Sequence, residues 1–223
     1  MKKLTFLATL AAAAALSPQA HAGDAEGRWQ LKVLGTGVLV DGKITKVDKD
    51  TVGLPAGSQT DINDNVVPTV AIEYYATPRL SIETICCLTQ HHATGAGPIA
   101  GAGIVDHIMI LPATVTLKYH LDAGPIKPYV GVGPSVFFFI DEKPGAVAAT
   151  FANRVHLDNR VGVALQAGMD IPVNAGGMGI SLDAKKYFIG TKAHFFNAGG
   201  TEVLTTEHKL DPWVVSGGVY LRF

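Results

Sequence analysis

Hydrophobic and polar residues alternate along eight separate stretches of this chain. Between residues 108 and 121, for example, Val115, Leu117 and Tyr119 share one parity, and Thr116 and Lys118 share the other. Successive side chains of a strand point to opposite faces, so each stretch predicts a strand with one apolar face. The eight stretches cover approximately residues 28–40, 67–77, 79–90, 108–121, 127–140, 159–171, 178–185 and 213–223.

The connections between these stretches alternate strictly in length. The second and third, fourth and fifth, and sixth and seventh stretches are joined by about two to six residues, whereas the other connections have roughly 15 to 26. An even-stranded antiparallel barrel, with turns at one rim and loops at the other, has this arrangement.

Two kinds of barrel fit the alternation. A soluble barrel that binds a ligand inside would turn its apolar parity inward, whereas a membrane barrel turns it toward lipid. The stretches are about 11 to 14 residues long, more than the roughly 5 to 6 of soluble strands and enough to cross a bilayer at a tilt. We therefore predict an all-β fold: an eight-stranded antiparallel transmembrane β-barrel with short periplasmic turns and long extracellular loops.

Composition supports the membrane alternative. Charged residues make up 17% of the chain, against about 25% in a typical soluble domain. The formal net charge of -1 argues against a basic surface for nucleic acid.

The first 22 residues have the three parts of a secretory signal peptide. Lys2 and Lys3 precede a mostly apolar run from Leu4 to Leu16, and Ala20 and Ala22 are the small residues of a cleavage site. We predict cleavage after Ala22, which leaves residues 23–223 as a single barrel domain in the envelope of a bacterium.

The only two cysteines, Cys86 and Cys87, are neighbours in the sequence. Adjacent side chains of a strand point to opposite faces, so a bridge between them would need severe distortion. We expect two free thiols.

A longer motif brings a family resemblance. Leu111–His120 (LPATVTLKYH) followed by Lys127–Gly133 (KPYVGVG) resembles the central hairpin of the outer-membrane protein W (OmpW/AlkL) family, and Phe223 resembles the terminal assembly signal of outer-membrane barrels. The resemblance implies an integral outer-membrane barrel with a narrow, largely hydrophobic interior that takes up small hydrophobic molecules passively and releases them sideways into the membrane. The implied partners are outer-membrane lipid, the barrel-assembly machinery with its periplasmic chaperones, and small hydrophobic solutes. The Cys86–Cys87 pair and the Gly/Ala-rich connection between the third and fourth stretches depart from the family pattern.

The interior of an eight-stranded barrel holds only side chains or one small ligand, so a wide aqueous pore is excluded. Unpaired charges in such a space are costly, and we expect the inward charges to pair in a structural plug at the periplasmic end, with a role in selectivity as the alternative. The predicted lumen charges are Lys32, Glu73, Glu83, Lys118, Arg160, Asp183, Lys185 and Arg222.

Two prolines suggest where a solute would leave the barrel. Pairing about a turn at residues 122–125 places Pro112 and Pro134 nearly opposite each other, and neither has an N–H to donate. We predict a local break in the strand ladder there, with a pair of tolerated bulges as the alternative. The predicted solute pathway comprises Pro112, Pro134, Tyr129 and Phe151, the last in a small, apolar connection that could form a funnel above the lumen.

Other functional classes have weaker support. An enzyme would need a nucleophile and a base, and the nearest candidates are Ser135 and His120. No third group to orient them is evident in the sequence, so we expect no enzymatic activity. The spacing of His91, His92 and His107 matches no known metal site. The segment Gly131–Gly133 lies in a predicted strand and is not followed by a helix, so it is no phosphate loop. We expect no cofactor. The main alternative to a channel is a nonconducting structural, adhesive or receptor barrel that acts through its extracellular loops.

Overall fold

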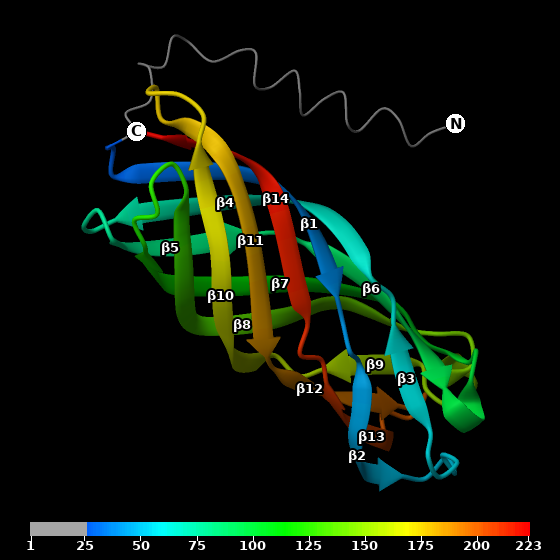
Figure 1. The fold of residues 1–223 in the computed structure, drawn as a ribbon. Helices are drawn as coiled ribbons and strands as arrows, with labels where there is room; N and C mark the ends of the chain where they lie inside the picture. Colours follow the sequence, from blue (N-terminus) through cyan, green and yellow to red (C-terminus); the bar gives the residue numbers. More distant parts are fainter. Residues whose placement is uncertain (1–25) are drawn as a thin grey trace, which may run out of the picture.

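The computed structural model describes residues 26–223, which form a closed antiparallel β-barrel (Figure 1). The predicted signal peptide and its cleavage site at Ala22 lie outside the described residues. The strands of the barrel wall are β1 (Trp29–Leu39), β4 (Asn65–Tyr75), β5 (Leu80–Cys86), β7 (Gly103–His120), β8 (Lys127–Pro144), β10 (Arg160–Pro172), β11 (Met178–Phe188) and β14 (Trp213–Arg222).

The eight strands pair in chain order around the wall, and the first and last strands close it. Val33 of β1 lies opposite Val219 of β14, for example, and opposite Val70 of β4 on its other side. The predicted fold class and all eight predicted strands are therefore confirmed.

The orientation of the strands is also as predicted. Leu117, Val132 and Leu182 lie on the outer face with 46–48% of their surface exposed, whereas the polar residues between them point inward and are buried. The barrel thus presents an apolar belt to its surroundings and a polar interior. Within the described residues, no helix is long and apolar enough to span a membrane.

The long connections contain more structure than we predicted. Expected as loops, they instead form β2 (Lys43–Asp50), β3 (Gln59–Ile62), β6 (Thr89–Ala96), β9 (Arg154–Leu157), β12 (Gly190–Phe196), β13 (Glu202–Lys209) and the short 3₁₀ turns η1 (Gly97–Ile99) and η2 (Ala148–Thr150). The alternation does not reveal these strands because β2 exposes both its faces and β6 is mostly small and polar.

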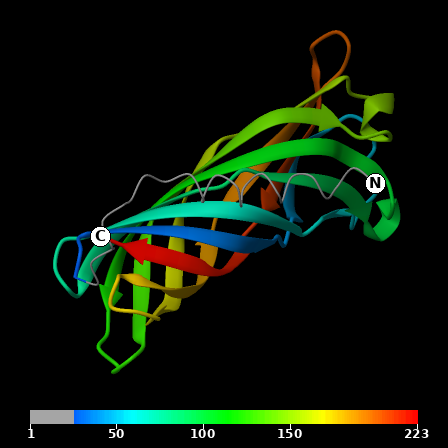
Figure 2. The same ribbon diagram turned by 90° about the horizontal axis from the view of Figure 1, so that it is seen from above.

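These additional strands extend the barrel at the end away from the chain's C-terminus (Figure 2). β3 and β6 continue the wall beside β7, and β2, β13, β12 and β9 form a separate four-stranded sheet. An apolar cluster fills the space inside, where Ile108, Phe139, Val155, Phe195 and Leu204 are all buried. We call this end the long-connection end and the other the short-turn end.

The wall is tightest between β7 and β8. A Cβ atom at Gly133 would lie 1.8 Å from the backbone oxygen of Val115, a separation that no side chain allows. At Gly35 of β1, by contrast, the nearest such atom is 3.9 Å away. Glycine at position 133 is therefore required for the two strands to approach.

Replacing Gly133 with alanine is expected to force β7 and β8 apart and to lower the free energy of unfolding by about 1–3 kcal/mol, the usual effect of overpacking. Urea unfolding of the refolded barrel in lipid vesicles measures this. The control is Gly35→Ala, which adds the same methyl group where there is room. Equal stability of the two variants would contradict the close approach.

Candidate functional site

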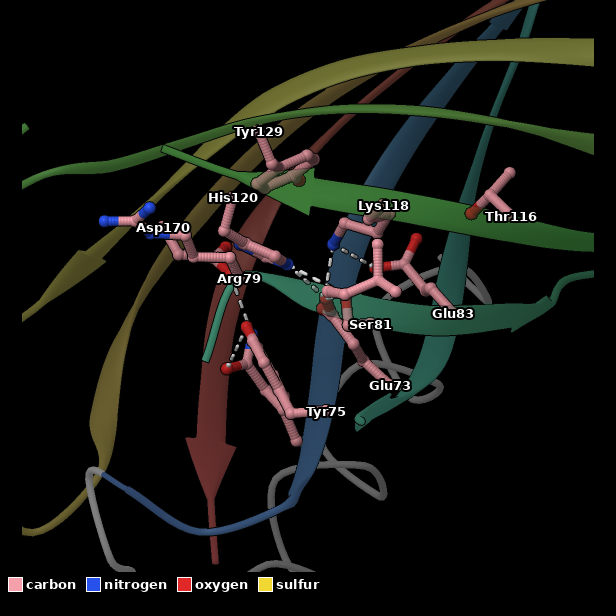
Figure 3. A network of polar contacts seen from close by, with 12 residues as sticks. Glu73, Tyr75, Arg79, Ser81, Glu83, Thr116, Lys118, His120, Tyr129 and Asp170 are labelled. Atoms are coloured by element: carbon pink, nitrogen blue, oxygen red, sulfur yellow. Dashed lines mark hydrogen bonds and ion pairs between the residues drawn. The ribbon is translucent and has the colours of Figure 1, made fainter. Parts of the chain in front are cut away.

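A network of buried charges fills the short-turn half of the bore (Figure 3). At its centre, two lysines and two glutamates alternate. Lys118 Nζ lies 2.8 Å from Glu73 Oε2 and 2.9 Å from Glu83 Oε2, and Lys32 Nζ lies 2.9 Å and 3.0 Å from the same two oxygens. All four side chains are at most 2% exposed. The Oε2 atom of each glutamate is thus shared by two ammonium groups.

Further residues extend this network around the bore. Lys185 Nζ lies 3.1 Å from Glu83 Oε1 and 2.6 Å from Asp183 Oδ1. Asp170 accepts a hydrogen bond of 2.9 Å from Gln30, and Gln166 donates to both Glu83 and Asp183. Arg222 covers the ring of Tyr75 at 3.7 Å, next to the short-turn end.

We call this network the plug. It comprises the cations Lys32, Lys118, Lys185 and Arg222, the carboxylates Glu73, Glu83, Asp170 and Asp183, and the polar residues Gln30, Ser81, His120, Tyr129 and Gln166, all of them buried. Its four cations balance its four carboxylates, so the bore carries no net formal charge in a region where an unpaired charge would be strongly unfavourable.

Seven of the eight predicted lumen charges lie in the plug. The prediction for Arg160 is wrong: its side chain is 42% exposed at the long-connection end of β10 and pairs with Asp158 at 3.1 Å. It has the inward parity but stands where the strand emerges from the bore. Asp170 was missed, although it has the same parity close to a short turn, which is the signal that would have identified it.

The plug also holds Tyr129, predicted as part of the solute pathway. Its hydroxyl donates to Asp183 at 2.9 Å, and the Lys118 ammonium lies 3.7 Å from its ring centre. This is a polar, ion-paired environment, and Tyr129 lines neither of the apolar cavities described below.

The structure separates the serine and histidine considered for catalysis. Ser135 lies opposite Thr114, and His120 lies opposite Tyr129, six residues further along the hairpin. His120 instead contacts Ser81 at 2.8 Å and Glu73 at 2.9 Å, but both contacts use Nε2, and Ser81 itself donates to Glu73. A catalytic triad needs the acid and the nucleophile on different imidazole nitrogens. The arrangement is structural, buried within the plug.

The bore becomes apolar on the other side of the plug. Val38, Ile85, Cys87, Phe137 and Val214 face a small cavity of about 20 Å³ there. A space of this size holds about one water molecule. No solute larger than water therefore fits this cavity unless the side chains that line it move.

A second, larger apolar cavity lies at the long-connection end, and we call it the vestibule. Its volume is about 160 Å³, and all four long connections line it, with Leu54, Ile99, Phe151 and Leu204 each from a different one. Phe151, a predicted pathway residue, packs against Phe195 here with the ring centres 6.1 Å apart.

One side of the vestibule is polar. His208 lies between two hydroxyls, with Nδ1 3.2 Å from Thr60 Oγ1 and Nε2 2.7 Å from Thr206 Oγ1. Burial lowers the pKa of His208 to about 4, against a smaller opposing effect of the Gly42 carbonyl. The imidazole is therefore neutral at pH 7.

The two prolines of the predicted exit do not face each other, so this prediction is wrong. Pro112 lies opposite Phe137, and the same register places Pro134 opposite Val115. The turn is centred one residue later than composition suggested, with Ala123 bridged to Ile126. The pairing of β7 with β8 is nevertheless interrupted at Pro134, because it stops after Thr114–Ser135 and resumes at Leu117–Val132.

A longer interruption involves Pro112 on the other side of β7. β5 pairs with β7 as far as Ile85–Thr114, and β6 resumes the same register at Thr89–Ile110. Residues 86–88 between them lie beside Pro112 without ladder pairs to β7, and the register of β4 with β5 places Pro68 beside Leu88. We call residues 86–88 the wall break. It lies level with the small apolar cavity, which Cys87 and Pro112 both line.

The two cysteines lie on opposite faces of the wall break. Cys86 is exposed on the outer face, Cys87 is buried toward the cavity, and both are free, as expected. The segment and the histidines considered for phosphate or metal binding contact other parts of the protein. Gly131–Gly133 lies within β8, His91 forms a hydrogen bond with the Asn63 carbonyl, and His107 Nε2 lies 3.2 Å from Asp141 Oδ2. Among residues 26–223, no three His, Cys, Asp or Glu side chains are grouped to hold a metal ion.

The sequence of this chain is similar to those of known outer-membrane proteins. A family model described as the OmpW family matches residues 25–223. The outer-membrane protein y4mB of Sinorhizobium fredii, itself uncharacterized, is 34% identical over 98% of this chain and 92% of its own length.

Solved structures show the same fold. The crystal structure of OprG from Pseudomonas aeruginosa is similar with a TM-score of 0.77 and 22% identity, over 90% of this chain and 98% of OprG. The solid-state NMR structure of AlkL in lipid bilayers is similar with a TM-score of 0.70 and 22% identity, over 93% of this chain and 95% of AlkL.

Removing one cation from the plug is expected to destabilise the barrel. Lys118→Met leaves Glu73 and Glu83 with one buried ammonium fewer, and breaking a buried pair typically costs about 3–5 kcal/mol. Urea unfolding in vesicles measures the change. The matched control is Lys143→Met, because Lys143 is 61% exposed and pairs at 3.4 Å with Asp141, which is itself exposed. If both variants unfold at the same urea concentration, the plug does not stabilise the fold.

Proposed function

The chain belongs to the OmpW family and is an integral β-barrel protein of the bacterial outer membrane, and from this premise we propose that it is a narrow channel for the passive uptake of small hydrophobic molecules. The short-turn end then faces the periplasm and the long-connection end faces the outside. The proposal assigns the protein a transport role and no catalytic one.

One observation supports this proposal above all: the bore changes character halfway along its length. The extracellular half is lined by apolar side chains, and the periplasmic half is filled by the plug. An apolar solute that enters from outside is accommodated in the first half. It is stopped at the second, because passing the plug would separate buried ion pairs and desolvate them against hydrocarbon.

The wall break supports sideways release at this level. Backbone hydrogen bonds normally seal a membrane barrel, since lipid offers no alternative partners. Residues 86–88 lack that seal toward β7, and the adjacent prolines have no N–H to restore it. Opening the wall here breaks fewer hydrogen bonds than elsewhere, and it connects the apolar cavity directly with the membrane interior.

The proposed partners follow from the same surfaces. The apolar belt contacts outer-membrane lipid, and the bore admits small hydrophobic solutes. Phe223 is 53% exposed beside Trp29, where the barrel-assembly machinery and periplasmic chaperones would reach the terminal residue.

Restoring the missing donors is expected to reduce transport. In the double variant Pro68→Val and Pro112→Val, two N–H groups become available to pair across the wall break, and uptake of an apolar solute into proteoliposomes should fall several-fold while the barrel remains folded. A polar solute of similar size, which should not enter in either case, gives the background.

Pro134→Val is the matched comparison because Pro134 lies at the interruption on the other side of β7. Normal uptake in this variant, with reduced uptake in the double variant, supports release at residues 86–88. Loss of uptake only in Pro134→Val would move the exit to the β7–β8 side. Unchanged uptake in both variants would contradict sideways release through either interruption.

A nonconducting barrel that acts through its extracellular part is a second candidate. The observation that favours it is the order of this part, in which six additional strands continue beyond the wall. Uptake of hydrophobic solutes in a deletion strain and conductance in planar bilayers distinguish the two candidates. A strain that takes up these solutes normally without the protein would favour the second.

A further inference from the structure

We propose that the vestibule selects compact, single-ring aromatic molecules that carry a hydroxyl group, that is, the phenol class, at the entrance of the channel. This inference deepens the proposed function and rests on it, since the vestibule is an apolar pocket at the end of the barrel where a solute would enter. Three properties of the cavity support it: its volume, the hydrogen-bonding state of its polar side, and its lack of charge.

The volume of the vestibule suits one ring. Engineered cavities of about 150 Å³ lined by Leu, Ile and Phe stay dry and bind benzene. The vestibule measures about 160 Å³, and its walls include Ile44, Leu54, Ile104, Phe151 and Phe195. A single six-membered ring with one small substituent therefore fills it, whereas a long alkyl chain would extend out of its open side.

The polar side has no donor left to offer. The Thr60 hydroxyl donates to the Gly42 carbonyl at 2.5 Å, so its contact with His208 requires Nδ1 to carry the proton. In a neutral imidazole Nε2 is then an acceptor, and the Thr206 hydroxyl donates to it at 2.7 Å. Every polar hydrogen of the three side chains is thus used, and the oxygen of Thr206 keeps acceptor capacity.

A ligand that complements this side must supply a hydrogen-bond donor. A phenolic hydroxyl does so, whereas an ether or a ketone brings only an acceptor and leaves its oxygen unpaired in an apolar space. Carboxylates are disfavoured further, because none of residues 26–223 brings a Lys or Arg side chain to the lining of the vestibule to balance their charge. The site therefore distinguishes a phenol from its methyl ether, although the two rings are nearly the same size.

Fluorine NMR of the full chain in detergent micelles tests this directly. The probes are para-fluorophenol, para-fluoroanisole and para-fluorobenzoate, each titrated also into empty micelles to subtract partition into detergent. We expect saturable binding of the phenol about threefold to tenfold tighter than that of the anisole, the value of one net hydrogen bond, and no saturable binding of the benzoate.

The variant Ala102→Phe localises the effect, because Ala102 lines the vestibule and a phenyl group there would occupy it. The control is Ala198→Phe, the same substitution at an exposed position of the β12–β13 connection. The preference for phenol should disappear in the first variant and persist in the second. If Ala102→Phe does not fold, Val147→Phe fills the same cavity.

The outcomes separate this inference from the channel proposal. Equal binding of phenol and anisole, or a preference that survives filling of the vestibule, would overturn the inference, and proteoliposome uptake of an apolar solute would still support the channel. Phenol selectivity at the vestibule without uptake of any apolar solute would instead contradict the channel and leave the binding site standing.

Discussion

The need to pair every backbone polar group within lipid is the constraint on which this structure depends. It requires a closed wall, and eight strands close to a bore that admits little more than side chains. The charges that point into this bore have no room for water and must satisfy one another. The plug, with Lys32 and Lys118 each shared between Glu73 and Glu83, is the consequence.

The same constraint makes the interruptions in the wall informative. Pro68, Pro112 and Pro134 all lie in strands of the barrel, where proline is unfavourable because it removes a ladder hydrogen bond. They are not scattered: two flank residues 86–88, and the third lies on the opposite side of β7. Below this level the wall encloses the plug, and above it the bore is apolar. The longest interruption of the wall beside β7 thus coincides with the boundary between the plug and the apolar part of the bore.

The barrel wall could be predicted from the sequence because lipid imposes a period of two on every strand that crosses it. The alternation around Val115, Leu117 and Tyr119 identifies both the strand and the face that turns outward. The same parity identified seven charges of the plug, but it did not show where a strand leaves the bore, so Arg160 was misplaced. The register was harder to predict. A shift of one residue in the turn at Ala123–Ile126 changes the partner of every residue in the hairpin, including that of Pro112.

The long connections could not be read from the sequence for a physical reason. Their strands contact one another and water rather than lipid, so no single face of them must be apolar. β2, for example, is exposed on both sides, and the pairing of β13 with β2 changes register twice. The residues that would discriminate between solutes, Thr60, Thr206 and His208, come from this part and meet only in the folded chain. The two halves of the molecule therefore serve different requirements. The plug satisfies the charges buried within the wall, whereas the residues of the proposed selective site lie in connections outside it.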